Sequence, residues 1–194
     1  DACGIGMIVN IKGEKSHALI EQALEILQRL EHRGGGGSEP DTGDGAGVLL
    51  QLPHGFMQKA CANQGIDLPG EGHYGLAMLF TSPDGETSAQ SIAAFIRIVK
   101  EEGLFVLGTR KVPTYPNCLG QTAREVCPKI RQVFIQRPEA MSAEDFERKL
   151  YVIPKLAYNA LRRCGQDKYF YAASISSPPA VSKGMRRPQH AHTS

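Results

Sequence analysis

The sequence has 194 residues, which is enough for one domain with a sizeable core. Apolar residues make up 41% of it and charged residues 22%, and the net charge is +2, which is the balance of a globular protein in water. This composition gives no reason to expect a nucleic acid or a membrane as partner, and no apolar run approaches the roughly 18 residues of a membrane-spanning helix.

The first predicted elements are a strand, a helix, a glycine-rich loop and a second strand. Residues 3–11 are mostly apolar and rich in β-branched side chains, which predicts a buried strand. Residues 16–32 place apolar side chains at helical spacing behind Ser16, a favourable N-cap, and predict a helix. The glycines that follow, between 34 and 47, predict a loop that leads into a strand at 47–52.

Further along the chain, predicted strands and helices alternate with connections of varied length. Pro154 lies within the last predicted helix and should kink or split it, because proline lacks an N–H and clashes with the preceding turn. Residues 109–120 and the chain from 178 onward are predicted to be irregular. The predicted helices are 56–64, 87–102 and 142–163, the last with Ser142 as its N-cap, and the predicted strands are 74–81, 104–108, 130–136 and 169–176.

This order of elements favours a mixed α/β or layered α+β domain. A doubly wound nucleotide-binding fold is the competing interpretation, so the glycine-rich loop has to be considered. The order helix, glycines, strand is wrong for a dinucleotide site, and no Gly-Lys-Ser/Thr follows the glycines for a phosphate loop. The loop also lacks the spacing of a calcium-binding EF-hand. Two readings stay open: a flexible connection, or a loop that brings backbone and Arg33 close to a small ligand.

The five cysteines form no C-x-x-C pair and no cluster with zinc-ligand spacing, so we predict no metal site. Their odd number favours free thiols in a reducing compartment. Cys61 and Cys164 lie in predicted helices and are interpreted as packing residues.

Several stretches resemble, in their order and spacing, the amino-terminal part of the large subunit of glutamate synthases. That part is a class II glutamine amidotransferase domain with the fold of N-terminal-nucleophile hydrolases. The resemblance covers nearly the whole chain to about residue 185. It departs from the family at Thr109, where tryptophan is usual, and at Pro154, where arginine is usual. The stretches are Cys3-Gly4-Ile5-Gly6, Glu31-His32-Arg33-Gly34, Thr42-Gly43-Asp44-Gly45-Ala46-Gly47 and Leu107-Gly108-x-Arg110-x-Val112-Pro113.

The resemblance implies an α+β fold, a four-layer α/β/β/α sandwich of two antiparallel sheets between helices. It implies that residues 1–185 are the amino-terminal part of the amidotransferase domain and that 186–194 are an irregular tail. The sequence lacks the later family stretches that hold the arginine for the glutamine carboxylate and the Asn-Gly pair of the oxyanion hole. The sandwich is therefore expected to be incomplete in this chain, and the 194 residues alone are expected to be inactive.

The resemblance also implies a nucleophile, Cys3, that hydrolyses glutamine to glutamate and ammonia. In the family the α-amine of this cysteine serves as base, so activity would require cleavage between Ala2 and Cys3. Gly4 and Gly6 are expected to leave room for substrate near the sulfur.

Four further positions match the family's pocket. Arg33 is expected either to shape the pocket and lower the pKa of the thiol, or to be an exposed helix-end arginine. Gly34 belongs to the same Arg-Gly pattern, and Asp44 and Gly45 resemble a family turn with an architectural role.

For a full-length enzyme the resemblance implies transfer of ammonia to 2-oxoglutarate, with FMN and an iron–sulfur cluster bound outside this chain. The implied partners are glutamine, the remaining synthase domains of the same polypeptide, and a small electron-transfer subunit or ferredoxin. The implied location is the cytoplasm, or a plastid in a photosynthetic eukaryote. Two alternatives stay open: a class II amidotransferase for another acceptor, and a non-catalytic module on a degenerate amidotransferase fold.

Overall fold

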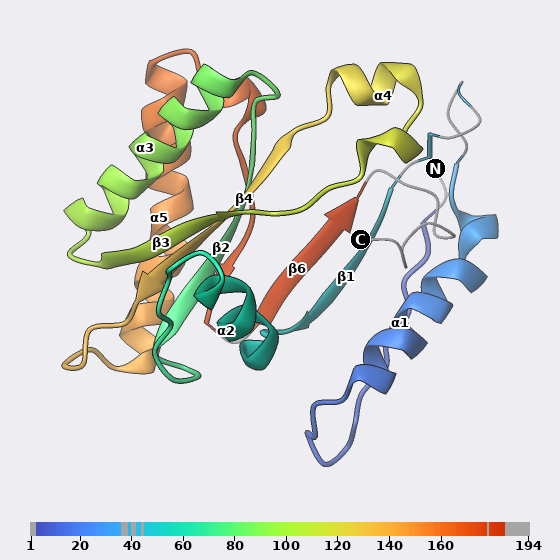
Figure 1. Ribbon diagram of the computed structural model, residues 1–194, viewed down its shortest axis with the longest axis horizontal. Helices are drawn as coiled ribbons and strands as arrows, with labels where there is room; N and C mark the ends of the chain where they lie inside the picture. The colour runs from blue at the N-terminus through green and yellow to red at the C-terminus, as the bar shows by residue number, and fades with distance from the viewer. Residues whose placement is uncertain (1–2, 36–38, 40–41, 44, 178, 185–194) are drawn as a thin grey trace. The chain divides into compact units, whose positions relative to one another are not determined.

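The computed structural model divides the chain into two compact units, and Figure 1 shows their elements. Each unit is assembled from stretches that are far apart in the sequence. The first unit takes its described residues from Asp1–Gln51, Pro113–Cys127 and Val181–Ser194, and the second from Leu52–Val112 and Pro128–Ala180. The structure describes residues 3–35, 39, 42–43, 45–177 and 179–184.

The second unit is built on a four-stranded sheet in which every neighbouring pair of strands is antiparallel. The doubly wound interpretation requires a largely parallel sheet and is therefore wrong for this unit. The layered arrangement of helices and an antiparallel sheet is confirmed. The strands, in spatial order, are β3 (Phe105–Lys111), β4 (Lys129–Gln136), β2 (Tyr74–Thr81) and β5 (Tyr171–Ser176).

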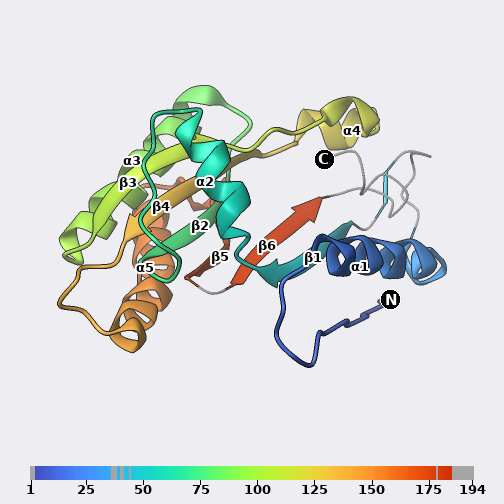
Figure 2. The same ribbon diagram turned by 60° about the horizontal axis from the view of Figure 1, so that its bottom comes forward.

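Helices cover both faces of this sheet (Figure 2). On one face, α3 (Gly85–Glu101) and α5 (Ala143–Arg163) pack against alternate residues of the central strands, such as Ala77 and Leu79. On the other face, α2 (His54–Ala62) packs against strand residues that point the opposite way, such as Leu76. Because both faces are covered, β2 is buried along nearly its whole length, which explains its continuous apolar sequence.

A buried arginine lies on the α2 side of the sheet. The guanidinium of Arg110 donates a hydrogen bond of 2.7 Å to the Gln132 side chain and lies 6.0 Å from the centre of the Phe56 ring. Cys61 of α2 is fully buried, and burial raises the pKa of its thiol. Because a protonated, buried thiol is a poor nucleophile, the interpretation of Cys61 as a packing residue fits its surroundings.

Helix α5 runs unbroken from Ala143 to Arg163 with Pro154 inside it, so the predicted split at this proline is wrong. Packing of one face stabilises the helix. The buried residues on that face are Phe146, Leu150, Ile153, Ala157 and Leu161. This burial compensates for the missing backbone hydrogen bond at the proline. Cys164 is the residue that ends the helix and is exposed, so its interpretation as a packing residue is wrong.

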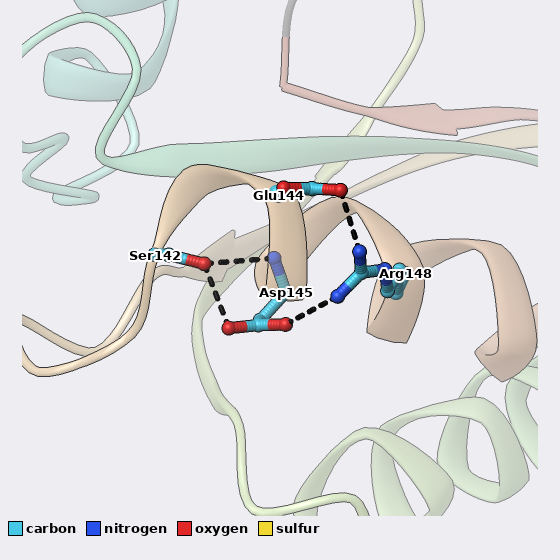
Figure 3. Close-up of polar contacts among 4 residues, drawn as sticks. All are labelled: Ser142, Glu144, Asp145 and Arg148. Carbon is cyan, nitrogen blue, oxygen red and sulfur yellow. Dashed lines mark hydrogen bonds and ion pairs between the residues drawn. The ribbon is translucent and has the colours of Figure 1, made fainter.

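The predicted N-cap of α5 is confirmed, and Figure 3 shows its contacts. The Ser142 hydroxyl oxygen accepts a hydrogen bond from the Asp145 N–H at 3.0 Å, and the hydroxyl donates to the Asp145 carboxylate at 2.7 Å. Arg148 pairs with both Glu144 and Asp145. The Ser142 hydrogen bond and, after it, the charge of Arg148 lower the pKa of the Asp145 carboxyl.

Replacing Ser142 with alanine is expected to destabilise the second unit by about 1 kcal/mol, because the first turn of α5 loses an acceptor for its N–H groups. Urea unfolding followed by circular dichroism measures this loss. Ser142→Thr keeps an acceptor and serves as the control, with an expected change below about 0.5 kcal/mol. Equal losses in the two variants would contradict the capping role.

The first unit contains a two-stranded sheet and the helices around it. Its strands are β1 (Ala46–Gln51) and β6 (Pro179–Gly184), and α1 (His17–Arg29) contacts β1. The predicted helix and its cap are confirmed, because the Ser16 hydroxyl accepts a hydrogen bond from the N–H of Leu19. Strand β6 corrects the prediction of an irregular chain from 178 onward, whereas the predicted tail 186–194 lies outside the described residues.

Two further predictions need correction. Residues 3–11 form no strand, and their apolar side chains are mostly exposed, Ile5 at 91% and Ile11 at 99%. A strand needs a ladder partner, and no described strand pairs with this segment. The stretch 109–120 is not wholly irregular, because β3 runs to Lys111 and a short 3-10 turn spans Pro116–Cys118, just before the five-residue helix α4 (Gln121–Glu125).

Candidate functional site

The candidate nucleophile, Cys3, lies on an extended segment beside the carboxyl-terminal part of α1. The two glycines of this segment face side chains of α1 and of the residue that follows it: a Cβ at Gly4 would lie 3.1 Å from the Leu30 side chain, and one at Gly6 would overlap the Ile26 side chain. The space beside these glycines is thus filled by side chains at the carboxyl-terminal end of α1. The sequence interpretation expected this space to admit substrate. The glycines allow the backbone next to Cys3 to approach the helix closely.

A larger side chain at Gly6 is expected to move the segment that carries Cys3. Gly6→Ala would place a methyl group against the branched Ile26 side chain, which cannot turn away freely. We expect the rate at which a glutamine-analogue electrophile labels Cys3 to fall about 10-fold. The double variant Gly6→Ala/Ile26→Ala removes the overlap and should restore the rate. A double variant as slow as the single one would show that Ile26 is not the cause.

Arg33 contacts the backbone of Cys3, the candidate nucleophile. It ends a 3-10 turn, Glu31–Arg33, that follows α1, and its Nε donates a hydrogen bond to the Cys3 carbonyl oxygen at 3.4 Å. This bond is long and its partner is the main chain rather than the sulfur. The structure therefore brings Cys3 and Arg33 together, in a contact between the Arg33 side chain and the Cys3 main chain.

Two of the three other predicted pocket positions, Gly34 and Gly45, lie in the described part of the chain. Gly34 follows Arg33 in an ordinary extended conformation and donates its N–H to the Glu31 carbonyl oxygen at 3.0 Å. Gly45 has a φ of +99°, a conformation that favours glycine, and it leads directly into β1. Asp44 lies outside the described residues.

In the glycine-rich loop, the Glu39 side chain forms hydrogen bonds with Thr42 and Thr122, and the sequence interpretation did not single it out. Its carboxylate accepts hydrogen bonds of 3.0 Å from the N–H and from the hydroxyl of Thr122 and from the hydroxyl of Thr42. The Thr122 N–H, followed by the two hydroxyls, lowers the pKa of the Glu39 carboxyl. No local pattern could have predicted a partner 83 residues away.

The thiols outside the candidate site vary in exposure and in partners. The Cys118 thiol donates to the Tyr115 carbonyl oxygen at 2.9 Å, whereas Cys164, like Cys3, is exposed. Over the described ranges no three His, Cys, Asp or Glu side chains gather as metal ligands would. In the same part of the chain no helix has the length and apolarity needed to cross a membrane.

Comparison with known proteins gives one family and several relatives. Residues 3–193 match the class II glutamine amidotransferases. The chain is 43% identical, over 97% of its length, to the large chain of the NADPH glutamate synthase of Bacillus subtilis. It is 34% identical, over 96% of its length, to the chloroplastic ferredoxin-dependent glutamate synthase of Oryza sativa. It is also 34% identical, over 97%, to the NADH glutamate synthase of Schizosaccharomyces pombe. The chain spans only 12%, 12% and 9% of these relatives.

Proposed function

Since the chain belongs to the class II glutamine amidotransferases, we propose that it supplies the glutaminase nucleophile, Cys3, of a glutamate synthase. The observation that carries the proposal is the exposed Cys3 at the first residue of the family match, with Arg33 bound to its carbonyl oxygen. Exposure lets a substrate reach the sulfur, and the Arg33 contact limits the orientations of the backbone that carries it.

In the proposed reaction the Cys3 sulfur attacks the side-chain amide carbon of glutamine. A carbon–sulfur bond forms, the carbon–nitrogen bond breaks, and ammonia leaves with the proton taken from the thiol. Water then attacks the γ-glutamyl thioester, which releases glutamate and regenerates the thiol. The α-amine of Cys3 is the proposed base, since its ordinary pKa of about 8 suits proton transfer near neutral pH. This role requires cleavage between Ala2 and Cys3, and residues 1–2 lie outside the described part of the chain.

The pocket proposal extends to Arg33, Gly34, Asp44 and Gly45. Arg33 would orient the nucleophile through the Cys3 carbonyl, and Gly45 would turn the loop into β1 with its positive φ. We propose that the whole domain is a four-layer α/β/β/α sandwich, of which residues 1–185 form the amino-terminal part. The helix-covered antiparallel sheet of the second unit supports this arrangement.

The relatives are named glutamate synthases, and we extend the proposal to the fate of the ammonia, namely the transfer to 2-oxoglutarate that the family resemblance implies. The iron–sulfur cluster and FMN that the resemblance implies for a full-length enzyme are assigned, as part of this proposal, to the other synthase domains. NADPH, NADH and ferredoxin each appear in the name of a relative and are the candidate electron donors. We propose a cytoplasmic protein, or a plastid one if the source is photosynthetic, because chloroplastic relatives exist.

The test of this function uses protein produced from its complete gene. Incubation with glutamine labelled with ¹⁵N in the side-chain amide should release labelled ammonia and glutamate in equal amounts. Intact-mass analysis should find Cys3 as the first residue of the active protein. Activity in protein that retains residues before Cys3 would exclude the α-amine as base, and the absence of ammonia release would contradict the glutaminase function itself.

A further inference from the structure

Arg110, in the second unit, is a buried cation whose charge is not balanced by an ion pair. The residue is 8% exposed, and its Nη1 donates a hydrogen bond of 2.7 Å to the side-chain oxygen of Gln132. Its Nε is buried without a hydrogen-bond partner, and no carboxylate of the described residues forms an ion pair with it. A buried arginine is rare unless it is paired, because its charge has to leave water.

Two weakly acidic groups are buried on the same side of the sheet, and neither of them balances this charge. Burial raises the pKa of the Cys61 thiol, although the charge of Arg110 opposes the rise. Burial also raises the pKa of the Tyr74 hydroxyl to about 12. Both groups are therefore neutral near pH 7, and the side-chain amide of Gln132 carries no charge. The charge of Arg110 thus calls for an anion from outside the described residues.

The donors that remain on Arg110 suit a carboxylate. Because Nη1 is bonded to Gln132, Nε and Nη2 are left, and these two nitrogens lie on the same edge of the guanidinium. Two N–H groups side by side match the two oxygens of a carboxylate, whose single charge balances that of one arginine. A phosphate would bring more negative charge than this one cation balances.

The surroundings of the guanidinium give a carboxylate a way in. Strand β3 has a strand neighbour on one side only, so Arg110 lies at the margin of the described sheet. The Phe56 ring, whose centre is 6.0 Å from the guanidinium carbon, is the exposed neighbour, at 59%. An exposed ring has room to turn aside and uncover Nε, and it offers an apolar surface beside the charge. The arrangement fits a carboxylate that is carried on a short apolar group.

We propose that Arg110 and Gln132, beside Phe56, form a carboxylate-binding site in the second unit. We call these three residues the Arg110 site. The carboxylate is that of a small molecule or of an aspartate or glutamate elsewhere in a longer polypeptide, and the two arms of one experiment distinguish these sources. The proposal goes beyond the glutaminase function, since Cys3 belongs to the first unit and the proposed hydrolysis does not use Arg110.

The first arm measures the binding of a free carboxylate to protein from the complete gene by ¹⁹F NMR. Trifluoropropionate carries one carboxylate on a short apolar group, and trifluoropropanamide is its neutral counterpart. For a free ligand we expect saturable line broadening of the propionate, with an affinity about 10-fold above that of the amide. Arg110→Met should abolish this broadening. Arg131→Met is the matched control and should keep it, because Arg131 pairs with Leu79 on the opposite face of the sheet.

The second arm finds a carboxylate that belongs to the polypeptide. Carbodiimide with glycinamide converts accessible carboxyl groups to amides, and mass spectrometry locates each product. A carboxylate held by Arg110 is protected, so one aspartate or glutamate should be labelled about 5-fold faster in Arg110→Met than in the unmodified protein. The rate at that residue should stay unchanged in Arg131→Met. The trifluoropropionate signal should then show no broadening that depends on Arg110.

Gln132→Glu keeps the test decisive if Arg110→Met fails to fold. It places a carboxylate where Arg110 already donates at 2.7 Å, so the charge is balanced within the chain and the melting temperature should not fall. This internal carboxylate should displace the external one, with the same loss of broadening or of protection as in Arg110→Met. Broadening and carboxyl labelling that are both unaffected by Gln132→Glu would overturn the proposal, as would equal changes in Arg131→Met.

Discussion

Replacing Cys3 with alanine is expected to reduce glutamine hydrolysis by about 10³-fold or more, because the reaction loses the atom that forms the thioester. Labelling by a glutamine-analogue electrophile should disappear with it. Cys3→Ser keeps a hydroxyl of similar size in the same place, but the hydroxyl is a much weaker nucleophile at neutral pH, so we expect a loss of comparable size. Ammonia release and intact-mass analysis after labelling measure the two effects.

Cys164 gives the matched control, since it is the other exposed thiol among the described residues. Cys164→Ala should retain hydrolysis within about 2-fold, because a surface substitution away from special features has a small effect. A protein that lost activity equally in both variants would point to general damage by thiol removal. Full activity in Cys3→Ala would show that another group attacks the amide.

The second large effect is expected in the core of the second unit. Phe146→Ala removes a fully buried ring from the face of α5 that packs against the sheet, and it should cost about 3–5 kcal/mol of unfolding free energy. We expect little collapse of the structure into the space left by the ring, because the facing strand already lies close to α5. A Cβ at Gly75 of that strand would lie 3.4 Å from Phe146 and 2.6 Å from Leu150. Urea unfolding of the variant measures the loss.

Tyr151, five residues further along the same helix, is the control for this substitution. Its side chain is 65% exposed, so Tyr151→Ala removes an aromatic ring without opening a cavity. We expect its effect to stay within about 0.5 kcal/mol. Similar losses for the two variants would mean that the effect comes from the helix and not from burial of Phe146.

The elements of the second unit could be predicted from the sequence because their patterns are local. Alternate faces of β2 meet different helices, and its continuous apolar run reflects this double burial. The spacing of apolar residues in α5, and the serine before it, sufficed for the helix and its start. The predicted split at Pro154 is wrong, because packing of a whole helix face outweighs one missing hydrogen bond.

The failed predictions involve partners that are distant in sequence. Residues 3–11 have the composition of a buried strand, but burial depends on a ladder partner, which the described chain does not supply. Helix α4 is too short for an apolar period, and its cap comes from Glu39. Strand β6 begins at a proline, a residue that usually argues against a strand, and it pairs with β1 from the other end of the chain.

The candidate site was predicted in part. The resemblance singled out Cys3 and Arg33, and the structure places Arg33 on the Cys3 carbonyl oxygen. The resemblance could not predict the packing of Gly4 and Gly6 against the end of α1, because a short motif does not specify which helix surface a segment contacts. Glu39 was one acidic residue among several in the loop, and only its distant partner distinguishes it.

The strand order of the second unit has a consequence for synthesis on the ribosome. The buried strand β2 pairs with β4 on one side and with β5 on the other, and β5 begins only at Tyr171. Elongation at about 5–20 residues per second leaves that edge of β2 open for roughly 5–20 s after β2 itself has emerged. An apolar strand with a free edge can pair with another chain during this interval. We therefore expect the yield of folded protein to rise at lower expression temperature, where fewer nascent chains are present at once, and on co-expression of chaperones that shield apolar strands.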